Sequence, residues 1–425
     1  MEKSIIQKKE QCNSKSDGIF PIIYTIFYCI STLLNGYSSG VGSLSIASIG
    51  YLVLSIFGLL YIIIAKKSLR NVWFIPIIML VFLLICTSLS ILFGDFQIFS
   101  LESIFMDFIK IGIWVISTSF LAVYLLDYCL AKKTLNIIAI FCTIYLIIQS
   151  IFFYIFGITL TNLFSFGFLK PNYDYYFSYD IYSGQFSYRP ASFFSEPSFY
   201  GYFVLMVFAI NLFDRKFIKE KLLFLCVLFL GLLLSTSSSA IYLTILTIFI
   251  YVVYKNKGWK KFLSIAIVLL SAALLFYFIS NFKFSDNQIG RTFSYSVNKI
   301  NDISIISRVG GSFEHLDKLN SFQKLFGIGV GNENLFISEG VSNENIYMNS
   351  VTTMIFWSGF FGFTLFTLLL VYMFFKTKNP VARFILVLYY FNGFYSAFYF
   401  SVFGIMYLSL FICIVYAEKR SDLIE

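Results

Sequence analysis

A short stretch near the middle of the chain gathers residues suited to holding a phosphate group. It reads RPASFFSEPSFYG over residues 189–201, so an arginine and Glu196 precede an apolar run. Pro197 suits the first turn of a helix and Ser195 suits its cap, and the free N–H groups of such a start favour an anion. Arg189 could add a bidentate grip on phosphate. The alternative is that Ser195 and Glu196 only cap the helix, while Arg189 anchors to lipid headgroups.

A second group lies around the single histidine of the chain, His315. Arg308 precedes it by seven residues, which places both on roughly the same side of a short helix, and Arg291 lies upstream in the same long segment. His315 could act as a general base on a hydroxyl group, with Glu314 or Glu196 as alternatives. A lone surface histidine, however, more often has no catalytic role.

The segment around His315 contains two further patterns. Helical spacing of four apolar residues predicts a short amphipathic helix over the membrane mouth: Val309, Phe313, Leu316 and Leu319. The sequence GIGVGNE (residues 327–333) could let the backbone approach a phosphate, but glycine spacing alone also fits a tight turn.

Aromatic and amide side chains near the same regions could contact sugars. Tyr176 and Tyr188 belong to a tyrosine-rich stretch, and their flat faces and hydroxyls suit stacking on sugar rings. Tyrosines also favour the membrane interface, so interfacial packing is the alternative. Asn349 could line a sugar cavity or satisfy a helix end.

Two charged residues, Asp107 and Lys110, lie close together inside an apolar run. Burial of such charges is costly unless they pair or face a polar cavity. A paired, structural role is therefore expected for them.

Several kinds of chemistry find no support in the sequence. With one histidine and no close pair of carboxylates at ligand spacing, nothing resembles a protein metal site. No GxxxxGK[ST] loop is present, and the short basic loops leave no room for a nucleotide-binding domain. We therefore expect neither a metal nor another cofactor, and no ATP-driven or nucleotide-sugar chemistry on the inner face.

The composition indicates that most of the chain lies in a lipid bilayer. The 425 residues are 59% hydrophobic and 12% charged, with a mean hydropathy of +0.82. Apolar runs of roughly 18 to 24 residues recur throughout, each long enough to cross the hydrocarbon core as a helix. The sequence predicts one all-α integral membrane domain over residues 1–425. About twelve helices are expected, centred near Tyr28, Leu54, Leu83, Ile116, Leu146, Val207, Leu228, Ile245, Leu269, Phe363, Val387 and Ile405.

Charge placement predicts the topology. The net charge is +9, and with the amino terminus inside, most of the 31 lysines and arginines fall on short cytoplasmic segments. This charge therefore indicates orientation rather than nucleic-acid binding, and both termini are predicted to be cytoplasmic. Two long segments, residues 161–195 and 281–346, then lie outside the cytoplasm, where we expect the function.

The order of these motifs resembles that of the bacterial O-antigen and capsular polysaccharide polymerases of the Wzy type, and more distantly that of the O-antigen ligases. The shared features are the stretch at 189–201, a polar Ser/Thr turn at Ser235, the late outer loop with Arg308 and FGIGVG, and the N-S…W-S-G-F-F-G helix at 349–362. Relatives usually have S-R in the polar turn, where this chain has Ser237-Ser238. Ligase-like members place a histidine before the asparagine that corresponds to Asn349, where this chain has Met348.

The resemblance implies a GT-C-like fold in a bacterial inner membrane and a glycosyltransferase activity. The donor of that family is an oligosaccharide on polyprenyl pyrophosphate, such as undecaprenyl pyrophosphate, and outer-loop arginines are implicated in holding it. By this resemblance, Arg189 is the first candidate for holding the donor, followed by Arg291 and Arg308. A flippase and a chain-length regulator are the expected protein partners.

These features predict a polymerase of lipopolysaccharide or capsule repeat units. Arginines and the helix start would stabilise the departing pyrophosphate while a carboxylate or His315 deprotonates the acceptor hydroxyl. The alternatives are an O-antigen ligase and a flippase or exporter of lipid-linked glycans.

Overall fold

The computed structural model describes residues 18–40, 44–66, 73–93, 100–162, 170–171, 177–180, 185–214, 219–256, 258, 313, 315–333 and 348–422. This part of the chain is mainly helical. Its helices are α1 (Ile19–Ser31), η1 (Thr32–Gly36), α2 (Ile46–Ile64), α3 (Phe74–Phe93), α4 (Leu101–Ile116), η3 (Ser117–Leu121), α5 (Ala122–Tyr124), α6 (Tyr128–Phe156), α7 (Pro197–Phe213), α8 (Lys219–Leu234), α9 (Ser238–Lys255), η5 (His315–Lys318), α14 (Ser321–Phe326), α16 (Ser350–Lys376), α17 (Pro380–Tyr395) and α18 (Val402–Asp422). Two antiparallel ribbons pair β1 (Tyr37–Ser38) with β2 (Lys170–Pro171), and β3 (Phe177–Asp180) with β4 (Gln185–Tyr188).

Seven of the described helical segments are long and apolar enough to cross a membrane. They are Ile19–Gly36, Ile46–Ile64, Phe74–Phe93, Leu101–Tyr124, Tyr128–Phe156, Ser238–Lys255 and Ser350–Lys376. Exposed apolar side chains such as Phe57, Leu84 and Phe141 give these helices a lipid-compatible surface. The chain is thus a helical membrane protein. Every helix centre expected from the sequence lies in a described helix, except Leu269, which lies outside the described residues.

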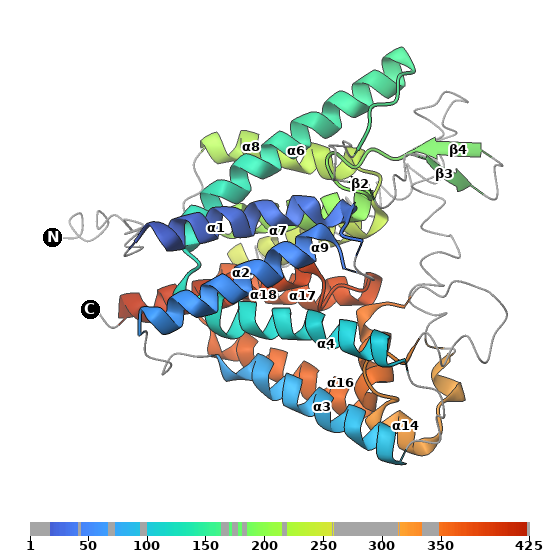
Figure 1. The fold of residues 1–425 in the computed structure, drawn as a ribbon. Helices are drawn as coiled ribbons and strands as arrows, with labels where there is room; N and C mark the ends of the chain where they lie inside the picture. The colour runs from blue at the N-terminus through green and yellow to red at the C-terminus, as the bar shows by residue number, and fades with distance from the viewer. Residues whose placement is uncertain are drawn as a thin grey trace.

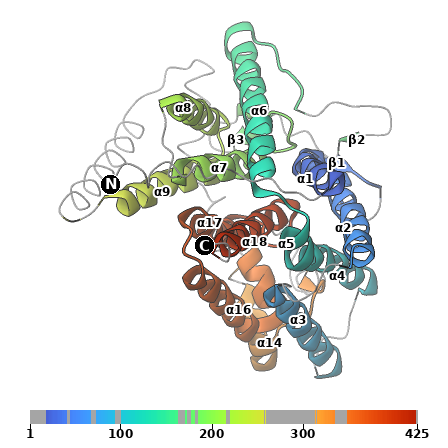
Figure 2. The ribbon, with the colours of Figure 1, turned by 90° about the vertical axis from the view of Figure 1, so that its left-hand side faces the viewer.

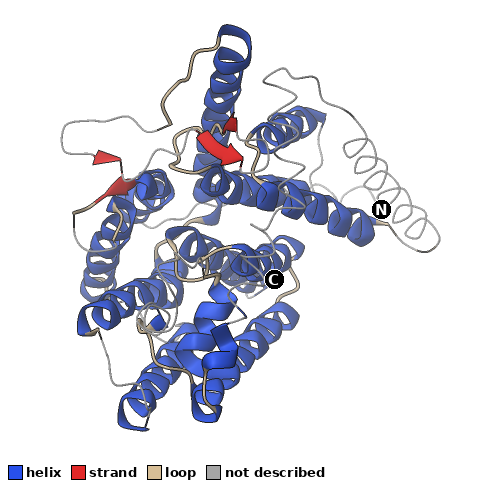
Figure 3. Ribbon diagram, turned by 90° about the vertical axis from the view of Figure 1, so that its right-hand side faces the viewer, coloured by secondary structure: helices blue, strands red, loops and turns tan. Residues whose placement is uncertain are grey.

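The bundle has two distinct ends. In Figure 1, α1 begins and α18 ends at the left, which we call the terminal end. The ribbon β3–β4 and α14 lie at the opposite end, called here the ribbon end, and Figure 3 looks onto its strands and tan loops. Figure 2 shows α17 and α18 inside the bundle, with helices from both halves of the chain around them.

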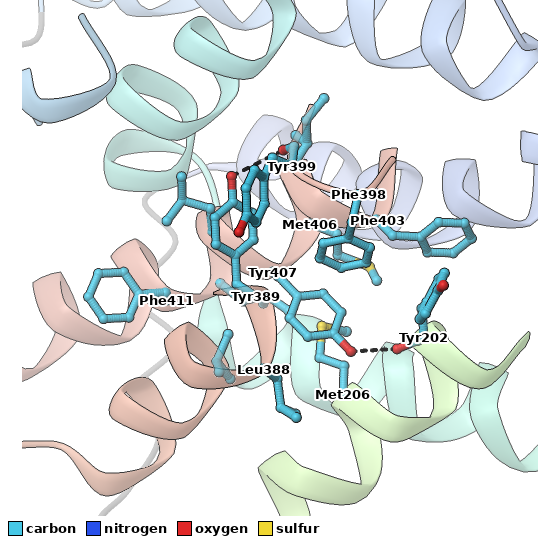
Figure 4. Packing of buried hydrophobic residues seen from close by; sticks show 14 of the residues in the cluster. Tyr202, Met206, Leu388, Tyr389, Phe398, Tyr399, Phe403, Met406, Tyr407 and Phe411 are labelled. Atoms are coloured by element: carbon cyan, nitrogen blue, oxygen red, sulfur yellow. Dashed lines mark hydrogen bonds between the residues drawn. The ribbon is translucent and has the colours of Figure 1, made fainter. Parts of the chain in front are cut away.

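Helix α7 is buried on all sides. It packs against α6, α8, α9, α17 and α18, as suits a helix that is apolar around its whole circumference. Its polar groups find partners inside the protein: Asn211 donates to Asn136 of α6 at 2.7 Å, and Tyr200 shares a 2.9 Å hydrogen bond with Thr143. The hydroxyl of Tyr407 on α18 donates to the carbonyl oxygen of Tyr202 at 2.6 Å (Figure 4). These bonds fix the position of α7 among its neighbours.

Helix α16 breaks at Gly359, which adopts φ 67° and ψ −177°. The break frees the carbonyl oxygen of Phe356, which accepts a 2.7 Å hydrogen bond from the N–H of Ile328. A Cβ at Gly359 would collide with the backbone of Leu325 and Phe326 at the end of α14. The break therefore lets α14 and the residues after it pack directly against the backbone of α16.

We expect the Gly359→Ala substitution to lower the unfolding midpoint in detergent by on the order of 5 °C, because it combines a forbidden backbone conformation with a backbone clash. Fluorescence-detected thermal unfolding measures this shift. The matched control is Gly112→Ala in α4, where an added Cβ meets no atom within 4 Å. Equal midpoints for the two variants would contradict the role given to the break.

Candidate functional site at the ribbon end

The segment that leads into α7, residues 189–196, is fastened to α6. Ser192 adopts a left-handed φ of 57°, held by a 2.9 Å bond from its N–H to Gln149 and a 2.7 Å bond from its hydroxyl to the carbonyl of Cys142. Asn162 accepts bonds from Gln149 at 3.0 Å and from the N–H of Ala191 at 3.3 Å. These bonds hold residues 189–196, called here the approach segment, in a defined conformation. Arg189, half-buried, opens it directly after β4.

The start of α7 differs from the sequence expectation by one residue. Pro197 is the first helical residue, as predicted, but the cap is Glu196, so the prediction of Ser195 as the cap is wrong. The physical reason is that proline at the first helical position makes the preceding residue the cap, whatever its side chain. Glu196 forms no side-chain cap, and its carboxylate instead accepts a 2.9 Å bond from the hydroxyl of Ser198. The first turn of α7 thus lacks a capping side chain, and Ser195 is buried beside it.

Tyr188 and Asn349 both have structural surroundings. Tyr188 is fully buried, and its ring stacks on Phe153 at 4.1 Å, so packing, the alternative reading, describes it better than sugar stacking. Asn349 is also fully buried and caps α16 by accepting a 2.9 Å bond from the N–H of Thr352. That bond confirms the helix-end alternative for Asn349.

His315 lies in η5 beside α14, away from the approach segment. Figures 1 and 2 place α14 and the β3–β4 ribbon on different sides of the ribbon end. Most of the predicted amphipathic helix lies outside the described residues; in the described part, η5 covers His315–Lys318, Leu316 and Leu319 are buried, and Phe313 is at the surface. The remaining predicted residues lie outside the described part of the chain: Tyr176, Arg291, Arg308, Val309 and Glu314.

A buried carboxylate that the sequence reading passed over, Glu333, closes the glycine turn at residues 327–333. The turn has left-handed φ values at its three glycines, and a Cβ at Gly331 would lie 2.8 Å from the backbone of Ser103 in α4. The N–H of Val330 donates to Thr87 of α3 at 3.1 Å. The turn is therefore wedged among α3, α4 and α16 and carries Glu333 into the protein.

Glu333 faces a small group of polar and charged side chains. Its carboxylate accepts a 2.7 Å bond from the indole N–H of Trp357. On α4, Lys110 pairs with Asp107 at 2.8 Å, which confirms the pairing predicted for them. Burial, and next the negative charge of Asp107, raise the pKa of Glu333 to about 7, while Trp357 and Lys110 act in the opposite direction. This carboxyl is thus able to exchange a proton near neutral pH.

Aromatic contacts run between this group and the start of α7. Trp357 stacks on Phe400 at 5.4 Å, and Phe400 belongs to the α17–α18 loop, residues 396–401. Just after this loop, Phe403 stacks on Phe199 in the first turn of α7 at 5.5 Å (Figure 4 labels Phe403). The loop itself is held by Ser350, whose hydroxyl accepts bonds from two of its N–H groups. The loop also reaches α7 through Phe398, whose ring lies edge-on to Tyr202 at 5.2 Å, so it contacts both the first half of α7 and the Glu333 group.

Chemically, the ribbon end combines an anion-compatible region with a proton-exchanging one. Arg189 and the first turn of α7 suit phosphate oxygens, whereas Glu333 suits proton transfer. Within the described residues, no group of three or more His, Cys, Asp or Glu side chains could hold a metal ion.

Comparison with protein-family models gives no match for this chain, and comparison with curated proteins gives none either.

The raised pKa of Glu333 predicts a pH-dependent stability that a Gln substitution removes. Because the folded state binds this proton more tightly, the stabilisation is complete below the ordinary value of 4.5 and is lost as pH rises through about 7. The loss amounts to about 3 kcal/mol. Thermal unfolding in detergent from about pH 5 to about pH 8 should show a falling midpoint for the wild type and a flatter profile for Glu333→Gln.

The control for this titration is Glu102→Gln, which removes an exposed carboxylate from the first turn of α4. It should keep the wild-type slope. A Glu333→Gln profile parallel to that of the wild type would contradict the assigned titration.

Proposed function

We propose that this chain is a polysaccharide polymerase of a bacterial inner membrane. It joins oligosaccharide repeat units carried on polyprenyl pyrophosphate, in a GT-C-like fold of about twelve spans with both termini in the cytoplasm. The ribbon end is then the extracytoplasmic face, and the product is O-antigen, capsule or a related glycan. A flippase would supply its substrate, and a chain-length regulator would limit its product.

The observation that carries the proposal is the approach to α7. Arg189 precedes a half-buried helix start that has no capping side chain, and the segment between them is fastened by Gln149 of α6 and by Asn162 beyond its end. A guanidinium next to a helix start favours a multiply charged anion. Since Pro197 has no N–H and the N–H groups of Phe199 and Tyr200 donate to the Glu196 carbonyl, Arg189 is the main donor in this proposal. A diphosphate is the leaving group that a glycosyl donor outside the cytoplasm must bring with it, because nucleotide sugars are not supplied there.

The chemistry assigned to this site is displacement at an anomeric carbon. An acceptor hydroxyl attacks that carbon, and the bond to the pyrophosphate oxygen breaks. Arg189 and the first turn of α7 stabilise the charge that grows on the departing pyrophosphate. Ser195 is buried beside this turn.

A second candidate, a flippase or exporter of lipid-linked glycans, is favoured by one observation. Asp107, Lys110 and Glu333 form an ionisable group among helices of a membrane protein, and such groups often mark proton or substrate paths. The two candidates differ in what accumulates when the chain is absent.

We expect Arg189→Ala to abolish glycan lengthening. In cells lacking the chain, wild-type protein should restore a ladder of glycan lengths on a gel. Arg189→Ala at an equal membrane level should leave mainly single repeat units, with a rate about 10²-fold or more below wild type, because a charge-assisted contact to the leaving group is lost.

Lys133→Ala is the matched control, since it removes an exposed cation near the terminal end of α6. It should restore the full ladder. Long unattached chains in the deletion strain would instead indicate a ligase. Repeat units accumulating on the inner leaflet would indicate a transporter.

A further inference from the structure

The group around Glu333 has an unbalanced charge. Asp107 and Lys110 form a neutral pair at 2.8 Å, with side chains 16% and 30% exposed. Glu333 is a second carboxylate facing the same lysine, and within the described residues it forms no salt bridge of its own. A buried negative charge without its own cation is costly, so this place favours uptake of one positive charge. Protonation of Glu333 would make the group of Asp107, Lys110 and Glu333 neutral.

Among the described elements around Glu333, α4 supplies Asp107, Lys110 and the exposed Glu102 of its first turn, and α14 supplies Lys324. Helix α3 has no charged residue over Phe74–Phe93, and α16 has none before Lys376 at its distant end. From these helices, Thr87 bonds the glycine turn and Trp357 bonds Glu333. Charge at Glu333 is therefore governed by Asp107 and Lys110 on α4.

Geometry holds the carboxylate in a fixed place. The turn is tied at Ile328 to Phe356 and at Val330 to Thr87, and Gly331 lies against the α4 backbone. Trp357, which donates to Glu333, also stacks on Phe400 of the α17–α18 loop. Proton transfer benefits from such fixed positioning, because the acceptor must lie within hydrogen-bond reach of the proton it takes.

We propose that Glu333 is the proton acceptor of the glycosyl transfer, with Asp107 and Lys110 as positioning residues that set its charge balance. This inference rests on the proposed polymerase function. The acceptor sugar docks by the α17–α18 loop, between the start of α7 and the glycine turn. Its hydroxyl oxygen bonds to the anomeric carbon, the carbon–pyrophosphate bond breaks with its electron pair leaving on the pyrophosphate, and the hydroxyl proton passes to Glu333.

Two other carboxyl or imidazole groups suit this role less well. Glu196 is the cap of α7, so its carboxylate lies beside the pyrophosphate region, where a negative charge opposes the leaving group. His315 lies in η5, which precedes α14 in the chain. Glu333 is separated from the leaving-group region and yet contacts the loop between them through Trp357.

The test uses membrane vesicles that contain the full-length chain and are supplied with polyprenyl-pyrophosphate-linked repeat units. Glu333→Gln should lower the rate of chain lengthening by about 10²-fold or more, as loss of a general base does. Glu102→Gln should leave the rate at the wild-type level. Thermal unfolding of each variant separates a lost proton acceptor from a lost fold.

The pH profile distinguishes an electrostatic role from a merely structural one. Removing the Asp107 charge with Asp107→Asn should move the acid limb of the rate profile to lower pH, because a neighbouring negative charge no longer favours the protonated Glu333. Lys110→Met should move the limb to higher pH. Shifts in these opposite directions support the proposal, and unchanged limbs with normal folding overturn it.

Failure of this inference is distinguishable from failure of the proposed function. Lengthening that depends on Arg189 but is unaffected by Glu333→Gln overturns the inference alone. Vesicles that never lengthen the glycan, while Glu333 still titrates in thermal unfolding, overturn the polymerase function and the catalytic role together.

Discussion

Inside a bilayer, each backbone N–H and carbonyl group must find its partner within the protein, and the ribbon end depends on how α16 meets that demand. The break at Gly359 leaves the Phe356 carbonyl without a helical donor, and Ile328 supplies one. This bond, with that of Val330 to Thr87 and the close approach of Gly331 to α4, holds the glycine turn in the bundle. Glu333 follows at the end of that turn, so a backbone requirement determines where the buried carboxylate lies.

Long, apolar segments were predictable from the sequence because hydrocarbon selects for length and hydropathy alone. Helices α2, α3 and α6 are clear in the sequence for that reason, and Pro197 marked the start of α7 because its ring fits only the first turn. The cap was misassigned by one residue because side-chain preference favoured Ser195. Position relative to the proline was the stronger local constraint.

Contacts between distant parts of the chain could not be predicted in this way. Asp107, Glu333 and Trp357 come from three separate segments, and no local pattern states that they meet. The one available signal was an acidic residue two positions after the last of three alternating glycines, in a turn next to apolar helices. Tyr188 and Asn349 show the converse: residue type suggested sugar contact, but burial against Phe153 and a capping bond to Thr352 occupy them.

For the proposed function, the region that would stabilise the leaving group is separate from the carboxylate that would accept the proton. In the proposed polymerase, stabilisation of the leaving group requires positive potential, which we assign to Arg189 and the α7 start. The proposed proton acceptance requires a carboxylate outside that potential with a pKa near neutrality, and burial raises the pKa of Glu333 to about 7. The α17–α18 loop contacts both regions, and Ser350 fixes this loop through its hydroxyl.

The most direct test of the central claim is reconstitution of the purified chain in lipid vesicles with polyprenyl-pyrophosphate-linked repeat units as the only sugar source. Product length is read by mass spectrometry, with no nucleotide sugar and no other protein present. The account predicts glycans of two or more repeats on one lipid carrier, with release of free polyprenyl pyrophosphate. Repeat units that remain single, from protein that is folded by its thermal transition, would contradict it.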